Sequence, residues 1–186
     1  NQICLPPLTY NMSKPSGLTT EDCLLTAEYS NIQYFVFSGG KLYRWNDAAA
    51  TFSDNGTVTG GWSSLLATLT SNPTDSEIFK DYLYFAYGLG TQKMVLSGSE
   101  TVSAVTGDAS YFQVWDEKLW KLYLVGTVWT TAYTSAGGAS GESWTVGGVF
   151  PSGVTPTQLP TFRNVAGDAA IVESITGFVE RTEKLG

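Results

Sequence analysis

Two adjacent acids, Asp116 and Glu117, have the residue types that acid–base chemistry needs. Glycoside hydrolysis requires only two carboxylates held about 5 to 10 Å apart, so a glycosidase-type hydrolase is one hypothesis for this chain. The two acids lie between β-type runs, however, where carboxylates ordinarily serve a turn and are solvated. Three further acids, Glu142, Asp168 and Glu173, are scattered, and nothing in the sequence brings them together.

The chain contains no histidine. This excludes Ser-His-Asp and Cys-His catalytic arrangements, imidazole bases, and most zinc and haem sites. A phosphate-binding P-loop and the glycine fingerprint of dinucleotide-binding proteins are also absent from the sequence. We therefore expect a protein that is not an enzyme, has no catalytic residues and needs no cofactor.

Calcium is the metal that the acidic loops of a β protein would favour, because calcium takes oxygen ligands. Residues 53–56 and 107–108 are loop-like stretches that carry such oxygens. Neither follows a known calcium-binding spacing, and Asp and Asn in loops ordinarily stabilise turns. We therefore assign no metal ligand.

The charge of the chain bears on its partners. The formal net charge is −7, and the ten basic residues do not cluster. Nucleic acid and anionic membranes both require a concentrated positive surface, and no apolar run is long enough for a spanning helix. The expected partners are other protein subunits in an oligomeric assembly, and we expect neither nucleic-acid binding nor membrane insertion.

Six tryptophans and ten tyrosines could pack in the core or form exposed platforms for sugars and proteins. Most aromatic residues of a β protein lie in the core or on a sheet face. Trp115, beside the expected turn, is the tryptophan that we predict to be exposed. Trp45 and Trp129 complete the predicted ligand-binding set, which would suit a carbohydrate-binding module that recognises glycans.

We expect an extracellular protein or one at a virion surface, and two features favour the extracellular setting. Cys4 and Cys23 are separated by 18 residues, and a disulfide closing that loop would contribute about 3 kcal/mol. The alternative is a pair of buried free thiols. Sequons at Asn11 and Asn55 would allow N-glycosylation.

The elements that must position these side chains are β-strands. Glycine, serine and threonine are plentiful, whereas only 15% of the residues are charged. That composition favours short strands and many turns over surface helices, which need charged outer faces. Residues 1–30 are predicted to form an N-terminal arm, with a short helix near residues 19–28 indicated by its capping pattern. Residues 31–186 are predicted to form an antiparallel all-β domain.

One hairpin pattern occurs twice, at residues 34–45 and 111–122. Tyr34 corresponds to Tyr111 and Lys41 to Lys118, without a gap, at an offset of 77 residues. Looser versions begin near residues 82 and 161, so steps of about 50 residues recur. A step of that size is near the period of a four-stranded propeller blade.

The aromatic hairpins and the tryptophans that follow them, Trp62 and Trp144, resemble β-propeller repeat proteins over residues 31–180. The resemblance implies a propeller-like domain of three to four blade-like units; a β-sandwich or jelly roll is the alternative. The texture is also similar to propeller-like tail and appendage proteins of phages. The leading hypothesis is therefore a non-enzymatic structural or adhesive module of an extracellular or virion assembly. A carbohydrate-binding module is the first alternative function and a glycosidase-type hydrolase the second.

Overall fold

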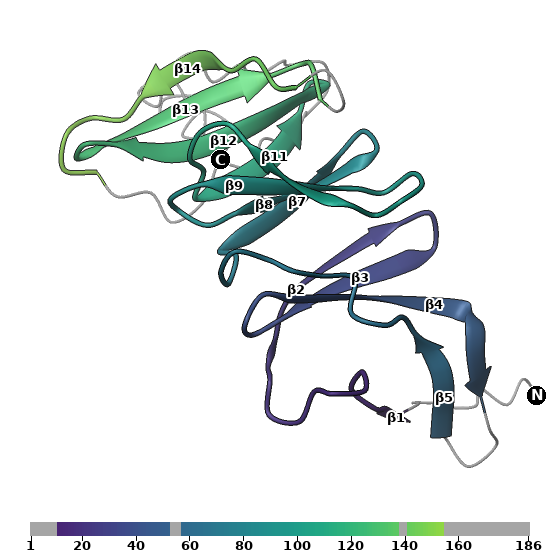
Figure 1. Cartoon of the computed structure of the whole chain (residues 1–186). Helices are drawn as coiled ribbons and strands as arrows, with labels where there is room; N and C mark the ends of the chain where they lie inside the picture. The colour runs from purple at the N-terminus through teal and green to yellow at the C-terminus, as the bar shows by residue number, and fades with distance from the viewer. Residues whose placement is uncertain (1–10, 53–56, 138–140, 155–186) are drawn as a thin grey trace, which may run out of the picture. The chain divides into compact units, whose positions relative to one another are not determined.

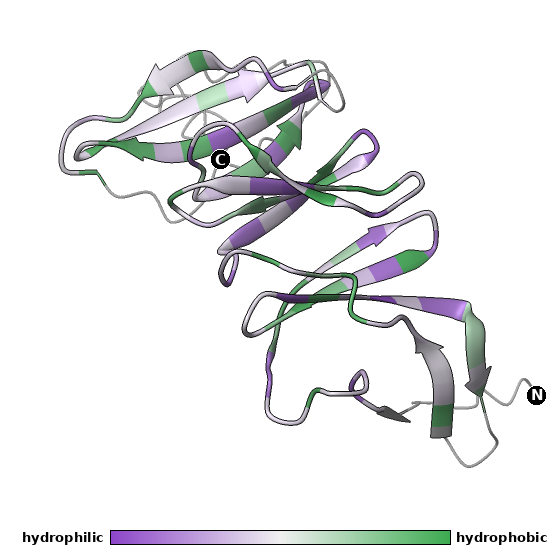
Figure 2. Cartoon of the chain, viewed as in Figure 1, coloured by the Kyte–Doolittle hydropathy of each residue, from purple (hydrophilic) through white to green (hydrophobic). Residues whose placement is uncertain are grey.

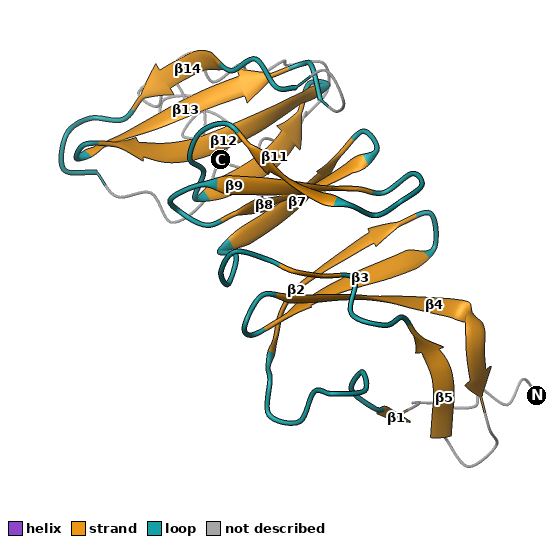
Figure 3. Ribbon diagram, in the orientation of Figure 1, coloured by secondary structure: helices purple, strands orange, loops and turns teal. Residues whose placement is uncertain are grey.

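The computed structural model of the chain describes residues 11–52, 57–137 and 141–154, and these residues contain strands but no helix (Figure 3). The strands form three sheets. Every strand pair is antiparallel except one, β1 (Asn11–Met12) with β5 (Thr57–Trp62), and no sheet in the described part closes on itself. The prediction of an antiparallel all-β fold is confirmed.

The chain divides into two compact units, Asn1–Thr70 and Ser71–Gly186, which we call unit 1 and unit 2. Unit 1 contains one sheet, sheet A, with the strand order β1-β5-β4-β3-β2 and a short strand, β6, that pairs with β4. The further strands of sheet A are β2 (Cys23–Tyr29), β3 (Ile32–Phe37), β4 (Lys41–Phe52) and β6 (Ala67–Thr68).

The short helix predicted near residues 19–28 is wrong. Most of that segment forms β2, which pairs antiparallel with β3. The residues interpreted as a helix cap instead stabilise the loop before β2: the Glu21 carboxylate accepts hydrogen bonds from the amides of Thr19 and Thr20, at 2.8 and 3.1 Å. Pairing with a neighbouring strand overrides local helix propensity here. The boundary drawn after residue 30 falls within the two-residue turn between β2 and β3.

Unit 2 contains two four-stranded sheets, each a meander of consecutive strands (Figure 1). Sheet B has the order β10-β9-β8-β7, and sheet C has the order β11-β12-β13-β14. The strands of sheet B are β7 (Asp75–Phe79), β8 (Tyr82–Ala86), β9 (Thr91–Val95) and β10 (Val102–Val105). Those of sheet C are β11 (Tyr111–Trp115), β12 (Lys118–Val125), β13 (Val128–Thr134) and β14 (Thr145–Val149).

The three sheets repeat one local design. Each contains four consecutive antiparallel strands, and its first hairpin turns on two residues. At least one residue of each turn has a positive φ: 50° at Ser30, 55° at Lys80 and 51° at Asp116. Left-handed residues suit two-residue hairpins because their twist matches that of the strands.

Side chains at matching positions after these turns are buried in all three sheets. The third residue after the turn is Tyr34, Tyr84 or Trp120, at 1%, 0% and 7% exposure. Val36, Ala86 and Leu122, two residues further on, are buried too. The equivalent positions are therefore 50 and 36 residues apart, so the first step agrees with the predicted period of about 50.

The offset of 77 residues does not relate equivalent strands. Residues 34–45 belong to β3 and β4, the second hairpin of sheet A, whereas residues 111–122 belong to β11 and β12, the first hairpin of sheet C. The two segments match because any aromatic hairpin with one lysine at its turn fits the same pattern. Spacing along the sequence could not distinguish a first hairpin from a second.

The strands carry alternating hydrophobic and hydrophilic bands, which is the pattern of sheets with packed faces (Figure 2). In unit 1, Trp62 is the centre of an aromatic cluster on one face of sheet A. Its ring lies 5.0 Å from Phe35, 5.1 Å from Trp45 and 6.2 Å from Phe37, in each case edge to face. In unit 2, one buried cluster joins the two sheets, with Phe79 and Tyr84 from sheet B and Phe112 and Leu119 from sheet C.

Candidate binding surface

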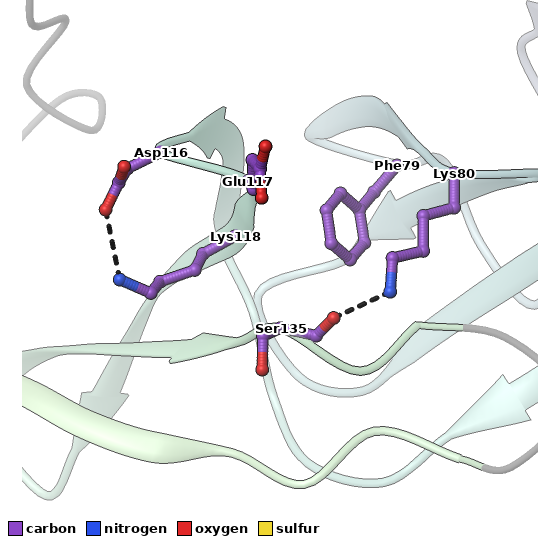
Figure 4. A pocket seen from close by; sticks show the side chains of 6 residues that line it. All are labelled: Phe79, Lys80, Asp116, Glu117, Lys118 and Ser135. Atoms are coloured by element: carbon purple, nitrogen blue, oxygen red, sulfur yellow. Dashed lines mark hydrogen bonds and ion pairs between the residues drawn. The ribbon is translucent and has the colours of Figure 1, made fainter.

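A pocket of about 630 Å³ opens between the first turns of sheets B and C (Figure 4). The β7–β8 turn supplies Lys80, and the β11–β12 turn supplies Asp116 and Glu117. The residues that line the pocket are Phe79, Lys80, Asp116, Glu117, Lys118 and Ser135.

The two adjacent acids are turn residues, with φ angles of 51° at Asp116 and 57° at Glu117. Both side chains are exposed, and Lys118 Nζ lies 3.1 Å from Asp116 Oδ2 in a surface ion pair. Across the pocket, Lys80 Nζ donates a hydrogen bond to the carbonyl of Ser135 at 2.7 Å. A general acid normally sits in an apolar environment, whereas these carboxylates face solvent.

Trp45 is not available to a ligand, so the prediction for this residue is wrong. Its side chain is 3% exposed, and its indole Nε1 donates to Asp47 Oδ1 at 2.5 Å. Gly61 lies directly against the ring: a Cβ at that position would be 2.5 Å from the Trp45 side chain. Trp45 is therefore part of the core of unit 1.

The other two predicted tryptophans come together on one face of sheet C. Trp115 and Trp129 both pack against a buried cluster of Trp120, Leu122 and Phe150. Trp115 is half-buried rather than fully exposed, with its ring centroid 6.2 Å from that of Trp120. The aromatic side chains that the sequence predicted to form a ligand platform here mainly pack against one another.

Several predicted positions lie wholly or partly outside the described residues. Cys23 is a free, exposed cysteine and Cys4 lies outside the described part, so the disulfide stays a prediction. Asn11 pairs through its backbone with Thr57 in β1–β5, and its side chain is not described. Asn55, the loop at residues 53–56, the acids Asp168 and Glu173, and the hairpin expected near residue 161 lie outside as well.

The second loop considered for calcium has a structural role. Asp108 Oδ1 accepts a hydrogen bond from the amide of Gly90 at 2.7 Å, which joins two loops of unit 2. Within the described residues, no three Asp, Glu, Cys or His side chains are grouped closely enough to bind a metal ion. The same part of the chain has no helix of the length and hydrophobicity that crossing a membrane requires.

Glu142, which the sequence left without a role, is a central buried residue of unit 2. Its Oε1 accepts hydrogen bonds from Tyr84 Oη and from Lys93 Nζ, each at 2.7 Å. The side chains of Lys93 and Glu142 are only 10% and 4% exposed. Tyr84 and Lys93 are cross-strand partners in sheet B, whereas Glu142 lies just before β14 of sheet C. The ion pair therefore fixes that loop to sheet B.

A second lysine, Lys121, is buried against aromatic rings. Lys121 belongs to β12, and its Nζ lies 4.3 Å from the ring centre of Trp144 and 4.7 Å from that of Tyr123. Burial lowers the pKa of this ammonium to about 8, and the nearby Asp108 carboxylate opposes part of that effect. Cation–π contacts are thus one way in which unit 2 holds a charge inside.

Two carboxylates of β7 cap the edge of sheet C. The amide of Phe112 donates to Asp75 Oδ2 at 2.7 Å, and the amide of Val114 donates to the Glu77 carboxylate. Both donors belong to β11, an edge strand whose outward amides have no strand partner. The two acids and the two amides share the two-residue period of a strand, so they meet in register.

Strand β14, the opposite edge of sheet C, has no strand partner on its outer side among the described residues. Val146 and Val149 project from it with 60% and 54% exposure. Their cross-strand partners, Ala132 and Thr130, place them on the face that also carries Val125, 55% exposed, and Val128, half-buried. We call Val125, Val128, Val146 and Val149 the valine surface.

Three other edge strands in the described part of the chain carry their own protection. β11 meets the carboxylates of β7, and β10 is four residues long with small exposed side chains at Ser103 and Ala104. β2 carries the exposed Glu28. Short length and charge are the usual protections of an edge strand. β14 has five residues and a bulge at Gly147, but it carries no charged residue. Exposed apolar side chains beside an edge that is open among the described residues indicate a contact surface.

No protein-family model matches this chain, and no curated protein matches it in sequence.

We predict that Glu142→Ala destabilises the protein strongly. The substitution removes the carboxylate partner of a buried lysine, a change that typically costs about 3 kcal/mol or more. Replacing both partners, in Glu142→Ala with Lys93→Met, should recover most of the loss because no buried charge is left. Urea unfolding measures both, and equal losses in the single and double variants would contradict the role of the ion pair.

We predict that the free energy of unfolding of unit 2 falls as the pH rises, because two half-buried carboxylates cap the edge of sheet C. Burial raises the pKa of both Asp75 and Glu77 above their ordinary values of 3.8 and 4.5. The folded chain therefore holds these protons more tightly than the unfolded chain, and stability falls as the pH rises through the interval between the two pKa values.

Unfolding experiments at pH values from about 4 to about 7 test this linkage. Asp75→Asn removes one titrating group while keeping an oxygen that can accept from Phe112, so its stability should depend less on pH than that of the wild type. Asp116→Asn, at an exposed acid of the β11–β12 turn, is the matched control. An unchanged slope in Asp75→Asn would show that this carboxylate does not titrate differently in the two states.

Proposed function

We propose that this chain is a non-enzymatic structural or adhesive β module that acts through protein–protein contacts in an extracellular or virion assembly. The observation that carries the proposal is the valine surface beside the open edge of β14. Its three most exposed members, Val125, Val146 and Val149, each have more than half of their surface in contact with solvent. Burying such side chains against a partner would gain roughly 25 cal/mol for each Å² removed from water.

The chemistry of the described side chains supports a contact role over catalysis. The buried acids, Asp75, Glu77 and Glu142, are engaged with amides or with a lysine inside the fold. The exposed acids Asp116 and Glu117 form a turn. Carboxylates used in this way hold elements together, and the valine surface is the group of exposed apolar side chains beside an edge strand that we assign to a contact.

The repeated meander supports a propeller-like architecture. A propeller blade is a sheet of four consecutive antiparallel strands, and blades repeat the same strand order and the same turns. The three sheets share this order, a two-residue first turn and buried residues at matching positions. In the alternative, a β-sandwich or jelly roll, consecutive strands commonly cross between two sheets. The virion setting rests on the resemblance to propeller-like phage tail and appendage proteins.

The turn pocket favours carbohydrate binding as a second candidate function. Its volume of about 630 Å³ lies in the range of small-ligand sites. Lysine, carboxylate and hydroxyl groups around it could bind the hydroxyls of a sugar. A glycan bound there should lose at least roughly tenfold in affinity in Lys118→Ala. Titration of a glycan panel, followed by isothermal titration calorimetry, decides this: no binding across the panel removes the candidate.

We predict that the chain runs in a native extract as part of an assembly well above its own mass of 20.0 kDa. A double variant, Val146→Lys with Val149→Lys, should shift it toward the free chain because two ammonium groups would have to be buried in the contact. Size-exclusion chromatography of an epitope-tagged full chain measures the shift. Leu89→Lys, at a side chain 83% exposed on the β8–β9 turn, is the control. If the wild-type chain and the double variant both run at the mass of the free chain, the proposed function is contradicted.

A further inference from the structure

We infer that residues 155–186, which follow the described part of the chain, cover an aromatic face of sheet C. This face is built from two buried side chains and the half-buried rings around them: Trp120, Leu122, Tyr111, Trp115, Trp129 and Tyr133. We call these six residues the aromatic face. It lies on the side of sheet C opposite to the valine surface, so the inference goes beyond the proposed function and does not depend on it.

The equivalent side of sheet B is covered by another part of the chain. Phe79 comes directly before the first turn of sheet B, and Tyr84 is the third residue after it. Both pack in the buried cluster that sheet C completes. Trp115 and Trp120 hold these two positions in sheet C. In this repeated design, the side of a sheet that carries these positions is a packing side.

A matching pair of contacts shows that the two sides are equivalent. On sheet B, Lys93 Nζ lies 4.9 Å from the ring centre of Tyr82, and on sheet C, Lys118 Nζ lies 5.3 Å from that of Tyr133. Tyr82 and Lys118 are each the first residue after the first turn. Lys93 and Tyr133 each lie opposite the third residue after it. The lysine and the ring have exchanged positions, and the contact between them is kept.

The indole of Trp120 indicates that the covering segment supplies a hydrogen-bond acceptor. Its Nε1 is buried, in a side chain that is 7% exposed, and has no acceptor within the described residues. A buried indole N–H ordinarily has one. A carbonyl or side-chain oxygen of the covering segment fills this role.

The position of the following chain selects it as the cover. Phe150 packs in the cluster of the aromatic face, and the described part ends four residues later. The amide of Val154 donates to the carbonyl of Pro151 at 3.2 Å, which is the hydrogen bond of a β-turn. The chain therefore changes direction directly after β14, and residues 155–186 start within reach of the aromatic face.

The following chain also has the length and the side chains that a cover needs. Residues 155–186 are as long a stretch as the one that builds sheet B, Asp75–Val105. Their sequence contains two apolar runs, at 169–172 and 177–179. Burying such side chains against the half-buried rings gains roughly 25 cal/mol for each Å² removed from water.

Unit 1 covers its own aromatic cluster in this way. Residues 13–22, which contain no strand, precede sheet A, and Leu18 from this segment packs against Phe37. Trp62 Nε1 donates to the carbonyl of Ser13 at 2.7 Å. A segment outside the sheet thus covers aromatic rings and supplies the acceptor for an indole N–H, which is the role that we assign to residues 155–186 in unit 2.

Photo-crosslinking within the full chain tests the inference. The probe p-benzoylphenylalanine replaces Trp129, a half-buried member of the aromatic face, and mass spectrometry locates the residues to which it is linked. The expected links lie within residues 155–186 of the same chain. The same probe in place of Tyr123, a half-buried ring on the opposite side of sheet C, is the matched control and should give no such links.

A mixture of isotope-labelled and unlabelled chains separates the sources of the links. Links to residues 155–186 within one chain support the inference. Links between labelled and unlabelled chains show that a second copy covers this face, and they overturn it. Links to other parts of the same chain, or no links, overturn it as well.

Substitutions in the covering segment provide a second readout. Ile171→Asp with Phe178→Asp places a carboxylate in each apolar run, so the segment should leave the aromatic face. Hydroxyl-radical labelling of Trp115 and Trp129 should then rise, while that of Trp45, in the core of unit 1, stays unchanged. Unchanged labelling of all three would overturn the inference. A rise at Trp45 as well would mark unfolding, and the cross-links then decide.

Discussion

The hydrogen-bonding groups along the open edges of its sheets are the constraint that shapes unit 2. An edge strand leaves a row of amides and carbonyls without strand partners, and a folded chain must pair, shorten or shield them. Unit 2 shields one edge of sheet C with Asp75 and Glu77, whose carboxylates accept from the amides of β11. Sheets B and C are joined by this contact, by a shared apolar cluster and by the ion pair of Glu142 with Lys93.

These contacts place ionisable groups inside the fold. Burial raises the pKa of Asp75 and Glu77 and lowers that of Lys121 to about 8, so each of these groups loses hydration relative to the unfolded chain. For the two acids, hydrogen bonds from backbone amides offset this loss of hydration. For Lys121, the surrounding aromatic rings offset it. The proposed function therefore rests on the valine surface and not on these buried charges.

The same constraint leads to that surface. Once β11 is capped, the outer side of β14 is the edge of sheet C that stays open among the residues the structure describes, and it carries exposed valines instead of charge. A monomer ordinarily avoids such an edge. A contact module needs one, because backbone groups supply affinity and the apolar side chains supply buried area.

The sequence by itself determined what depends on neighbouring residues. Alternating aromatic runs and small-residue turns gave the all-β class, and the adjacent acids Asp116 and Glu117 were correctly assigned to a turn. Local signals failed at residues 19–28, where the apparent helix start is a loop and the residues after it form a strand that pairs with β3. Tertiary structure alone decided the rest. Burial of Trp45 depends on Gly61 and Trp62, and the role of Glu142 depends on Lys93, 49 residues away. Edges are likewise a property of the whole sheet, because a strand is open only when no other segment pairs with it.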